Sequence, residues 1–232
     1  MENFAIEPAP SDLSKAGIYL NPDVNGMGQE RMGTSIMAAI FNGGVIFGAD
    51  TRTTMGAYVA SRISDKIECI HEKIFCCRTG VSAHTQALAR YVRYYLSQHV
   101  LNEGKLPLVL TAARLLQELL YQNKAFLEGG FIVGGWDPVN GSQLYEVALG
   151  GTLVSQRYAL MGSGSTYIYG YCDAEFREGM SQEECTKFIK KGLALAMARD
   201  GGSGGCERLL VVTPETVTRE YVPQEEFPYN LR

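Results

Sequence analysis

The sequence predicts an α+β protein in which two antiparallel sheets stack face to face, with helices covering both outer faces. Stretches of strand length occur as neighbouring pairs, and amphipathic stretches of helix length separate these pairs. The elements do not follow the strict alternation of strand and helix that is typical of doubly wound parallel sheets. Stacking the two sheets between layers of helices would bury the apolar side of every predicted element.

Apolar runs bounded by turn residues predict the strands, and apolar residues three and four positions apart predict the helices. Asn42-Gly43-Gly44 forms the first tight turn, and Asp137-Pro138-Val139-Asn140-Gly141 forms a later one. The predicted strands cover residues 34–41, 45–50, 66–70, 73–78, 131–137, 143–149, 152–156, 157–162, 207–212 and 216–222. The predicted helices cover residues 82–101, a segment opened by Pro107, a segment that starts near Ser165, and residues 181–199.

Each long helix is predicted from one apolar face. In residues 82–101 this face consists of Leu88, Tyr91, Val92, Tyr95 and Leu96. In the helix after Pro107 it consists of Leu108, Ala112, Leu115 and Leu119. In residues 181–199, Ser181 and Glu184 form a capping box, and the inward face consists of Ile189, Leu193, Ala196 and Met197.

The composition predicts a globular protein that neither binds nucleic acid as its main partner nor spans a membrane. Of the 232 residues 46% are hydrophobic and 20% charged, which is enough apolar material for a sizeable core. The formal net charge is -4 without a basic run, so nucleic acid is not the expected partner. Acidic residues near the N-terminus and the lack of a long apolar stretch predict a soluble, intracellular protein without a targeting peptide or membrane span.

Residues 1–33 differ from the rest of the chain. Pro, Gly, Asn and Ser interrupt every periodicity there, so this segment is expected to be mostly irregular. From Thr34 onward no repeat or linker divides the sequence, which predicts a single domain over residues 34–232.

Cysteines, histidines and glycine-rich segments give no sign of a metal or phosphate site. The six cysteines contain no C-x-x-C pair and the three histidines match no zinc spacing, so we expect free thiols, mostly buried, and no metal. The segments 162–164, 201–205 and 104–105 lack the residues that complete a dinucleotide or Walker fingerprint. No cofactor is expected.

The dipeptide Gly33-Thr34 lies where the irregular leader meets the first strand. A hydroxyl in this position can attack the preceding carbonyl, and hydrolysis of the resulting ester releases the leader. The product begins with Thr34, so nucleophile and amine base lie on one residue. Asp50, at the end of the second strand, and Lys66, at the start of the third, are flanked by apolar residues and are candidates for a partly buried pair beside this hydroxyl.

Four ordered segments resemble one family: TSIMAAIFNGGVIFGADTRTT, KIFCCRTG, GSGSTYIYGY and ALAMARDGGSGG. They resemble the catalytic β-subunits of the eukaryotic 20S proteasome, most closely the caspase-like type, which cleaves after acidic residues. The resemblance runs from Thr34 essentially to the C-terminus. It implies the four-layer α-β-β-α sandwich of N-terminal nucleophile hydrolases and a threonine endopeptidase without a cofactor. Residues 1–33 would be a propeptide that the chain removes autocatalytically at Gly33-Thr34.

The resemblance also implies roles for individual residues. Thr34 matches the nucleophile, Lys66 the lysine that tunes it, and Asp50 the carboxylate that orients the lysine. Gly80 matches the residue whose backbone N–H stabilises the oxyanion. The group that positions the threonine amine and a water matches Ser163, Asp200 and Ser203. Thr54 matches a contact to the substrate backbone.

The expected specificity pocket contains one basic residue. Arg78 matches the residue at its base, where a guanidinium can hold an acidic side chain by two hydrogen bonds. The other pocket positions match Thr53, Ser64, Ser82 and Gln86. Glu68 departs from the family pattern, because an uncharged residue is usual there. If Glu68 faces Arg78 it weakens the acidic preference, and if it points outward it changes nothing; strand alternation puts it on the same face as Lys66.

The partners implied by the resemblance are other β-subunits in two stacked seven-membered rings, two outer α-rings and unfolded polypeptide substrates, in the cytoplasm and nucleus. Two other functions stay open at this point. A non-catalytic ring subunit would keep its leader and serve assembly. An amidohydrolase of the same fold would act alone on a small substrate. Ser35, in place of a more usual threonine, is expected to matter little.

Overall fold

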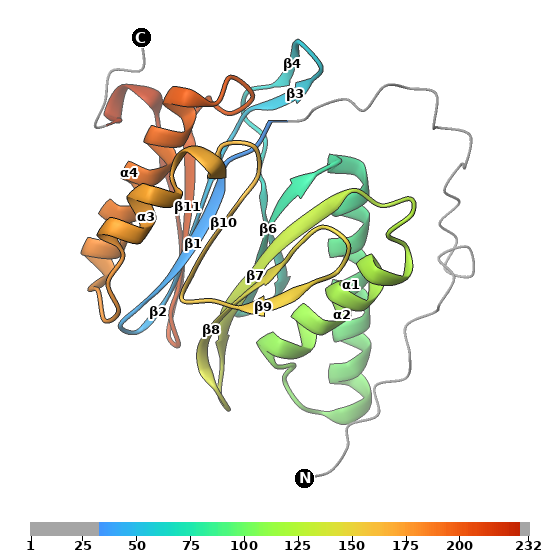
Figure 1. The fold of residues 1–232 in the computed structure, drawn as a ribbon. Helices are drawn as coiled ribbons and strands as arrows, with labels where there is room; N and C mark the ends of the chain where they lie inside the picture. The colour runs from blue at the N-terminus through green and yellow to red at the C-terminus, as the bar shows by residue number, and fades with distance from the viewer. Residues whose placement is uncertain (1–32, 228–232) are drawn as a thin grey trace.

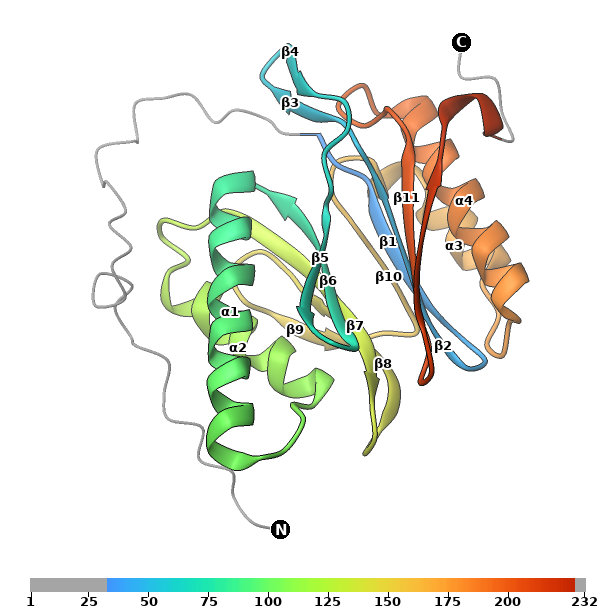
Figure 2. The same cartoon turned by 180° about the vertical axis from the view of Figure 1, so that it is seen from behind.

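Two five-stranded antiparallel sheets form the centre of the protein (Figures 1 and 2). In a computed structural model, which describes residues 33–227, the first sheet has the strand order β10-β1-β2-β11-β12 and the second β5-β6-β7-β8-β9. The first sheet consists of β1 (Ile36–Phe41), β2 (Gly44–Asp50), β10 (Tyr158–Met161), β11 (Glu207–Val212) and β12 (Val217–Val222). The second consists of β5 (Ile67–His71), β6 (Ile74–Gly80), β7 (Gly129–Asp137), β8 (Gly141–Val147) and β9 (Leu153–Ser155).

Helices cover the outer face of each sheet, as Figures 1 and 2 show. Helices α1 (Ser82–Glu103) and α2 (Val109–Gln122) pack on the second sheet, while α4 (Gln182–Arg199) packs on β1 and β2 of the first. The short helix α3 (Tyr169–Glu175) contacts α4. Single 3-10 turns lie at Ser165–Tyr167 and Gln224–Glu226. The predicted α+β class with two stacked antiparallel sheets is confirmed.

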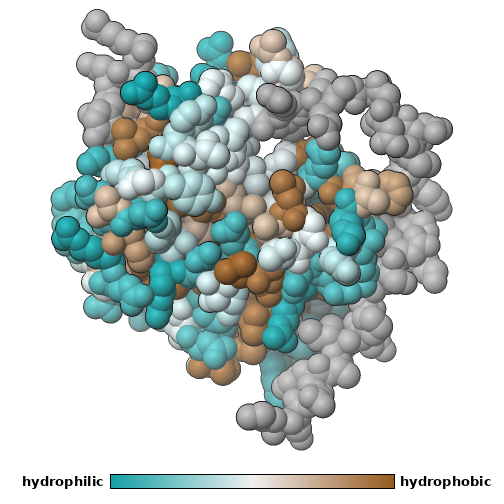
Figure 3. Space-filling model, in the orientation of Figure 1, coloured by the Kyte–Doolittle hydropathy of each residue, from teal (hydrophilic) through white to brown (hydrophobic). Residues whose placement is uncertain are grey.

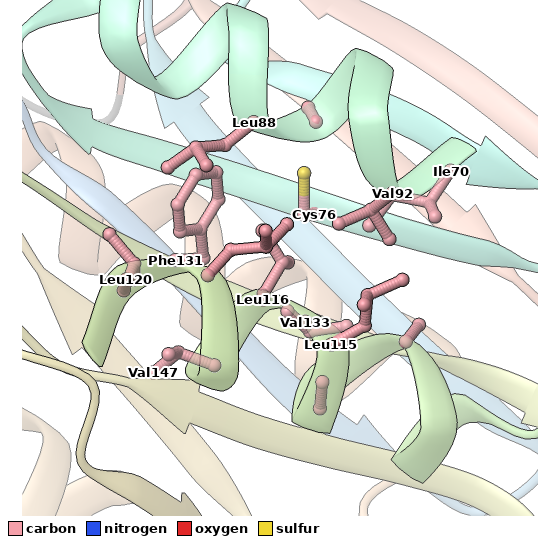
Figure 4. Packing of buried hydrophobic residues seen from close by; sticks show 14 of the residues in the cluster. Ile70, Cys76, Leu88, Val92, Leu115, Leu116, Leu120, Phe131, Val133 and Val147 are labelled. Carbon is pink, nitrogen blue, oxygen red and sulfur yellow. The ribbon is translucent and has the colours of Figure 1, made fainter. Parts of the chain in front are cut away.

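Three hydrophobic clusters hold the layers together. One lies between the second sheet and helices α1 and α2, where Leu88, Leu116 and Phe131 are almost completely buried (Figure 4). A second lies between α4 and the first sheet, and a third between the two sheets. Cys76 belongs to the first cluster and Cys77 to the third, because neighbouring residues of a strand point to opposite faces.

Most predicted helix faces are confirmed. All members of the predicted faces of α1 and α4 belong to the hydrophobic clusters or pack against them, and the Ser181–Glu184 capping box is present. The predicted start of α2 at Pro107 is wrong by two residues. This helix begins at Val109, whose backbone N–H donates to the Asp137 carboxylate at 3.0 Å, while Leu108 keeps an extended backbone. A carboxylate distant in the sequence therefore caps α2.

One hairpin was not predicted. Strands β3 (Thr53–Met55) and β4 (Tyr58–Ser61) form a separate two-stranded ribbon between β2 and β5. Its residues are largely exposed, so the alternation of buried and exposed positions that identifies a strand is weak. The predicted irregular leader, residues 1–32, lies outside the described residues.

Three further observations concern the surface, the helices and the thiols. Figure 3 shows hydrophobic residues in small groups separated by hydrophilic ones on the face that it presents. Between residues 33 and 227, no helix combines the length and apolarity needed to span a bilayer. All six cysteines are free, four of them buried, as predicted.

Candidate active site

The centre of the site is Thr34, two residues before the start of β1 at Ile36. Thr34 is buried, with 4% of its surface exposed. The Thr34 hydroxyl donates to the carbonyl oxygen of Gly33 at 2.7 Å. Its backbone N–H donates to the Ser163 hydroxyl at 3.1 Å. The hydroxyl of Thr34 thus lies beside the peptide bond that joins it to the leader.

Lys66 and Asp50 form a buried ion pair beside this hydroxyl, 2.6 Å apart. The ammonium of Lys66 also donates to Thr34 Oγ1 at 3.2 Å and to Gly33 O at 3.3 Å, so each of its three N–H groups has an acceptor. Burial lowers the pKa of Lys66, and the Asp50 carboxylate opposes this shift. The positive charge therefore faces both the hydroxyl and the Gly33 carbonyl.

Asp50 is held from four directions. Its Oδ1 accepts from Lys66 and from the backbone N–H of Ser35, at 2.9 Å for the latter. Its Oδ2 accepts from the backbone N–H groups of Arg52 and Gly204, at 3.2 and 3.1 Å. Burial raises the pKa of Asp50, while Lys66 and the backbone N–H groups of Ser35 and Gly204 lower it. The carboxylate fixes the direction of the lysine.

A second hydrogen-bonded chain reaches the backbone nitrogen of Thr34. Asp200, which follows α4, accepts from the Ser163 hydroxyl at 2.6 Å and from the Ser203 hydroxyl at 2.5 Å. Ser35 donates in turn to Ser203 at 2.8 Å. These hydrogen bonds connect the Thr34 backbone nitrogen through the Ser163 hydroxyl to the Asp200 carboxylate.

Gly33 is required by the close approach of two backbone segments. A Cβ atom at Gly33 would lie 2.1–2.2 Å from backbone atoms of Gly202. The Gly33 N–H donates to Thr54 Oγ1 at 2.8 Å. On the other side of Thr34, a Cβ atom at Gly162 would lie 2.2 Å from the Thr34 carbonyl oxygen, and Gly162 has a φ of +92°. Backbone of Gly202 and Gly162 thus lies close against Gly33 and Thr34.

A cavity of about 220 Å³ opens next to Thr34. It is lined by Gly33, Thr34, Thr53, Ser64, Asp65, Lys66, Arg78, Gly80, Ser82, Thr85 and Gln86. Polar side chains in its wall bind one another: the Thr53 hydroxyl donates to the Ser64 hydroxyl at 2.7 Å, and the Gln86 amide donates to the Ser82 hydroxyl at 3.1 Å. Every predicted pocket residue therefore lines this cavity, together with Gly80 at the end of β6.

Arg78 is 8% exposed and its guanidinium is held on three sides. Nη2 donates to the Asp65 carbonyl at 2.9 Å, and Nη1 to Thr85 Oγ1 at 3.4 Å. Nε lies 3.0 Å from Glu68 Oε2, an ion pair whose N–H is not aligned as a hydrogen bond. Of the two orientations considered for Glu68, the structure has the one that faces Arg78.

The structure brings together all seven residues predicted for the catalytic group. Hydrogen bonds connect six of them, Thr34, Asp50, Lys66, Ser163, Asp200 and Ser203, and Gly80 lines the cavity beside Thr34. Sequence reasoning missed the part played by Ser35, whose N–H and hydroxyl connect Asp50 to Ser203. Serine in place of threonine keeps that hydroxyl. Asp65 and Thr85, which accept hydrogen bonds from Arg78, were also missed. Asp65 contributes only its backbone carbonyl and Thr85 lies within α1, and neither feature forms a recognisable sequence motif. Among residues 33–227 no cluster of His, Cys, Asp or Glu could hold a metal ion.

The chain is similar to proteasome subunits over most of its length. The model of the proteasome subunit family matches residues 30–212. Proteasome subunit beta type-6 of Dictyostelium discoideum is 52% identical over 197 residues, which cover 85% of this chain and 92% of that protein. Proteasome subunit beta type-1 of Saccharomyces cerevisiae is 47% identical over 207 residues, covering 88% and 96%. Proteasome subunit beta type-6 of Arabidopsis thaliana is 43% identical over 204 residues, covering 88% of each chain.

The chain belongs to the proteasome subunit family, as its sequence motifs indicated. Within this family it is a beta-type subunit of the 20S core.

Proposed function

We propose that this subunit is a threonine endopeptidase that removes residues 1–33 from itself and then cleaves polypeptides through an ester on Thr34. The observation that carries the proposal is the contact of the Thr34 hydroxyl with both the Gly33 carbonyl, at 2.7 Å, and the Lys66 ammonium, at 3.2 Å. A structural residue would not need a buried charge directed at its hydroxyl, because burying an ion pair is costly.

Removal of the leader begins with attack of Thr34 Oγ on the Gly33 carbonyl carbon. The hydroxyl proton passes to the scissile nitrogen, the C–N bond breaks, and an ester joins Gly33 to Thr34 Oγ. Lys66 stabilises the negative charge that develops on Gly33 O, because its N–H already points at that oxygen. A water then hydrolyses the ester, releasing the leader as a carboxylic acid and leaving Thr34 with a free amine.

Peptide hydrolysis repeats this chemistry on a substrate. The free amine of Thr34, with a pKa near ~8, accepts the hydroxyl proton and passes it to the leaving amine of the substrate. Ser163, which accepts from the Thr34 nitrogen, and Asp200 hold that amine in place. The Gly80 N–H, at the cavity wall, would stabilise the oxyanion of each tetrahedral intermediate. Water then hydrolyses the acyl ester, so neither metal nor cofactor takes part.

The side chain before the scissile bond would enter the cavity lined by Arg78. The guanidinium offers Nη groups to an acidic side chain, which supports cleavage after Glu and Asp. Thr53, Ser64, Ser82 and Gln86 would contact that side chain, and Thr54, which accepts from the Gly33 N–H, would hold the substrate backbone. The substrates are unfolded polypeptides.

The subunit would act within two stacked seven-membered β-rings between two α-rings, in the cytoplasm and nucleus. Membership of the beta-type subunits of the 20S core supports this assembly.

Thr34→Ala tests this proposal. The variant, incorporated into assembled particles, is expected to keep residues 1–33 and to resist labelling by a β-lactone or epoxyketone probe. Thr34→Ser, which keeps the hydroxyl, is the matched control and is expected to lose the leader and to be labelled. If the alanine variant still matures, Thr34 does not remove the leader.

A non-catalytic ring subunit that keeps its leader is the alternative. The buried Asp50–Lys66 pair and the Ser163–Asp200–Ser203 chain argue against it, because all of them converge on Thr34. An amidohydrolase acting alone would require full activity from the isolated subunit.

A further inference from the structure

Arg78 lines two cavities whose other charged residues differ: Asp65 and Lys66 in the first, and Asp65, Glu68, Arg90, Arg93 and Arg219 in the second. The cavity beside Thr34 is lined by Arg78 but not by Glu68, whereas a second cavity of about 440 Å³ is lined by both. Asp65 and Gln86 also line both cavities, so they form the shared wall with Arg78. Glu68 therefore contacts the guanidinium from the side that a substrate in the first cavity does not occupy.

Strand register explains how Glu68 reaches Arg78. Glu68 in β5 lies opposite Cys76 in β6, and Arg78 is the diagonal neighbour two residues further along the same face. Long side chains bridge such diagonal positions in antiparallel pairs. The carboxylate lies 3.0 Å from Arg78 Nε, and the Glu68 side chain is only 20% exposed. Solvent screens this pair less than it would screen a surface ion pair.

We infer that Glu68 is a specificity-determining residue that weakens the preference for acidic side chains in the Thr34 cavity; this inference rests on the proposed function. The carboxylate of an incoming substrate must share the Arg78 guanidinium with the Glu68 carboxylate. Glu68 already offsets part of the positive charge of Arg78. An uncharged side chain loses nothing by this pairing. The substrate class is accordingly broadened to polypeptides with either an acidic or an uncharged apolar residue before the scissile bond.

Arg93 limits how strongly Glu68 neutralises Arg78. Its Nη2 lies 3.5 Å from Glu68 Oε1, while Arg78 Nε faces Glu68 Oε2. The carboxylate is thus divided between two guanidinium groups. Arg93 extends from α1 and lines only the second cavity, so it acts on the substrate through Glu68 rather than by contact.

The experiment compares kcat/KM for two peptides that differ only in Glu or Leu before the scissile bond, measured with assembled particles. Glu68→Gln is expected to raise the Glu/Leu ratio about tenfold, which corresponds to ~1.4 kcal/mol. The change should appear in KM for the Glu peptide and leave kcat for the Leu peptide unaltered. Arg93→Gln is expected to shift the ratio the other way, because it leaves Glu68 entirely to Arg78. A merely structural role of Glu68 would not give opposite signs for these two variants.

Glu72→Gln is the matched control. This residue lies in the turn between β5 and β6 and lines neither cavity, so the same change of charge should leave the ratio within twofold. Arg78→Ala distinguishes a failure of the Glu68 inference from a failure of the proposed specificity. If Arg78→Ala lowers the ratio but Glu68→Gln leaves it unchanged, the inference about Glu68 is overturned and the proposed specificity stands. If Arg78→Ala leaves the ratio unchanged, the post-acidic specificity fails, and the inference fails with it.

Discussion

Replacing Asp50 by Asn should disable the site while changing only one atom of the side chain. The two carboxylate oxygens of Asp50 accept four hydrogen bonds, two on each oxygen. An amide keeps one acceptor oxygen and turns an NH2 group toward the other two donors. Either Lys66 and Ser35, or Arg52 and Gly204, then lose their acceptor.

The size of the effect follows from the burial of the pair. Asp50 is fully buried and Lys66 is 7% exposed, so breaking the pair leaves an uncompensated charge, at a cost of about 3–5 kcal/mol in stability. Misdirecting the lysine should lower kcat/KM by roughly 10²–10⁴-fold, the range of a lost proton-transfer or charge-stabilising group. The assay is hydrolysis of a peptide with Glu before the scissile bond by assembled particles, with intact mass to score leader removal.

Asp137→Asn is a matched control for this substitution. Asp137 is also buried and accepts four hydrogen bonds, from Val109, Val139, Asn140 and Gln143. It lies at the end of β7 opposite to the end that pairs with Gly80. The control should lower stability but leave kcat/KM within a few-fold. Activity of the Asp50 variant within threefold of the unmodified subunit, in assembled particles, would refute the reasoning.

Two further predictions concern processing and stability. Gly33→Ala should leave the leader attached, because its Cβ would collide with Gly202. The intact mass of the chain measures this. Gly170→Ala, where a Cβ meets nothing within 4 Å, is the control and should lose the leader normally. The side-chain carboxyl of Glu207 is buried without a hydrogen-bond partner among residues 33–227, and burial raises its pKa to about 8 from an ordinary 4.5. The folded state holds a proton that the unfolded state releases, so stability should fall as pH rises from about 5 to about 8, by up to ~5 kcal/mol. Thermal unfolding of particles should show this slope, and Glu207→Gln should flatten it; an equal slope in both would contradict the assignment.

The sequence predicted the residues of the site better than their connections. Asp50 ends β2, and Thr34 and Lys66 lie just before β1 and β5, strands that apolar runs identify. The family resemblance assigned these three residues to one site. The pairing of Glu68 with Arg78 depends on the register between β5 and β6. Strand alternation predicts which face of β5 carries Glu68, but it does not predict which residue of β6 lies diagonally opposite.

Two features of the fold escaped prediction for a similar reason. The β3–β4 hairpin is mostly exposed, so it lacks the buried face that marks a strand. The start of α2 at Val109 depends on the Asp137 carboxylate, 28 residues away, and a cap supplied by tertiary structure leaves no local signal. Local rules therefore identified Pro107 as the first helical residue when the long-range contact decides otherwise.

The central claim is that Thr34 frees its own amine, and the intact mass of this chain, dissociated from natively assembled particles, tests it most directly. The account predicts a mass that matches residues 34–232, beginning at Thr34. A mass that matches the whole chain from Met1 to Arg232 in fully assembled particles would mean that the nucleophile stays blocked, which contradicts a catalytic role and favours the structural subunit.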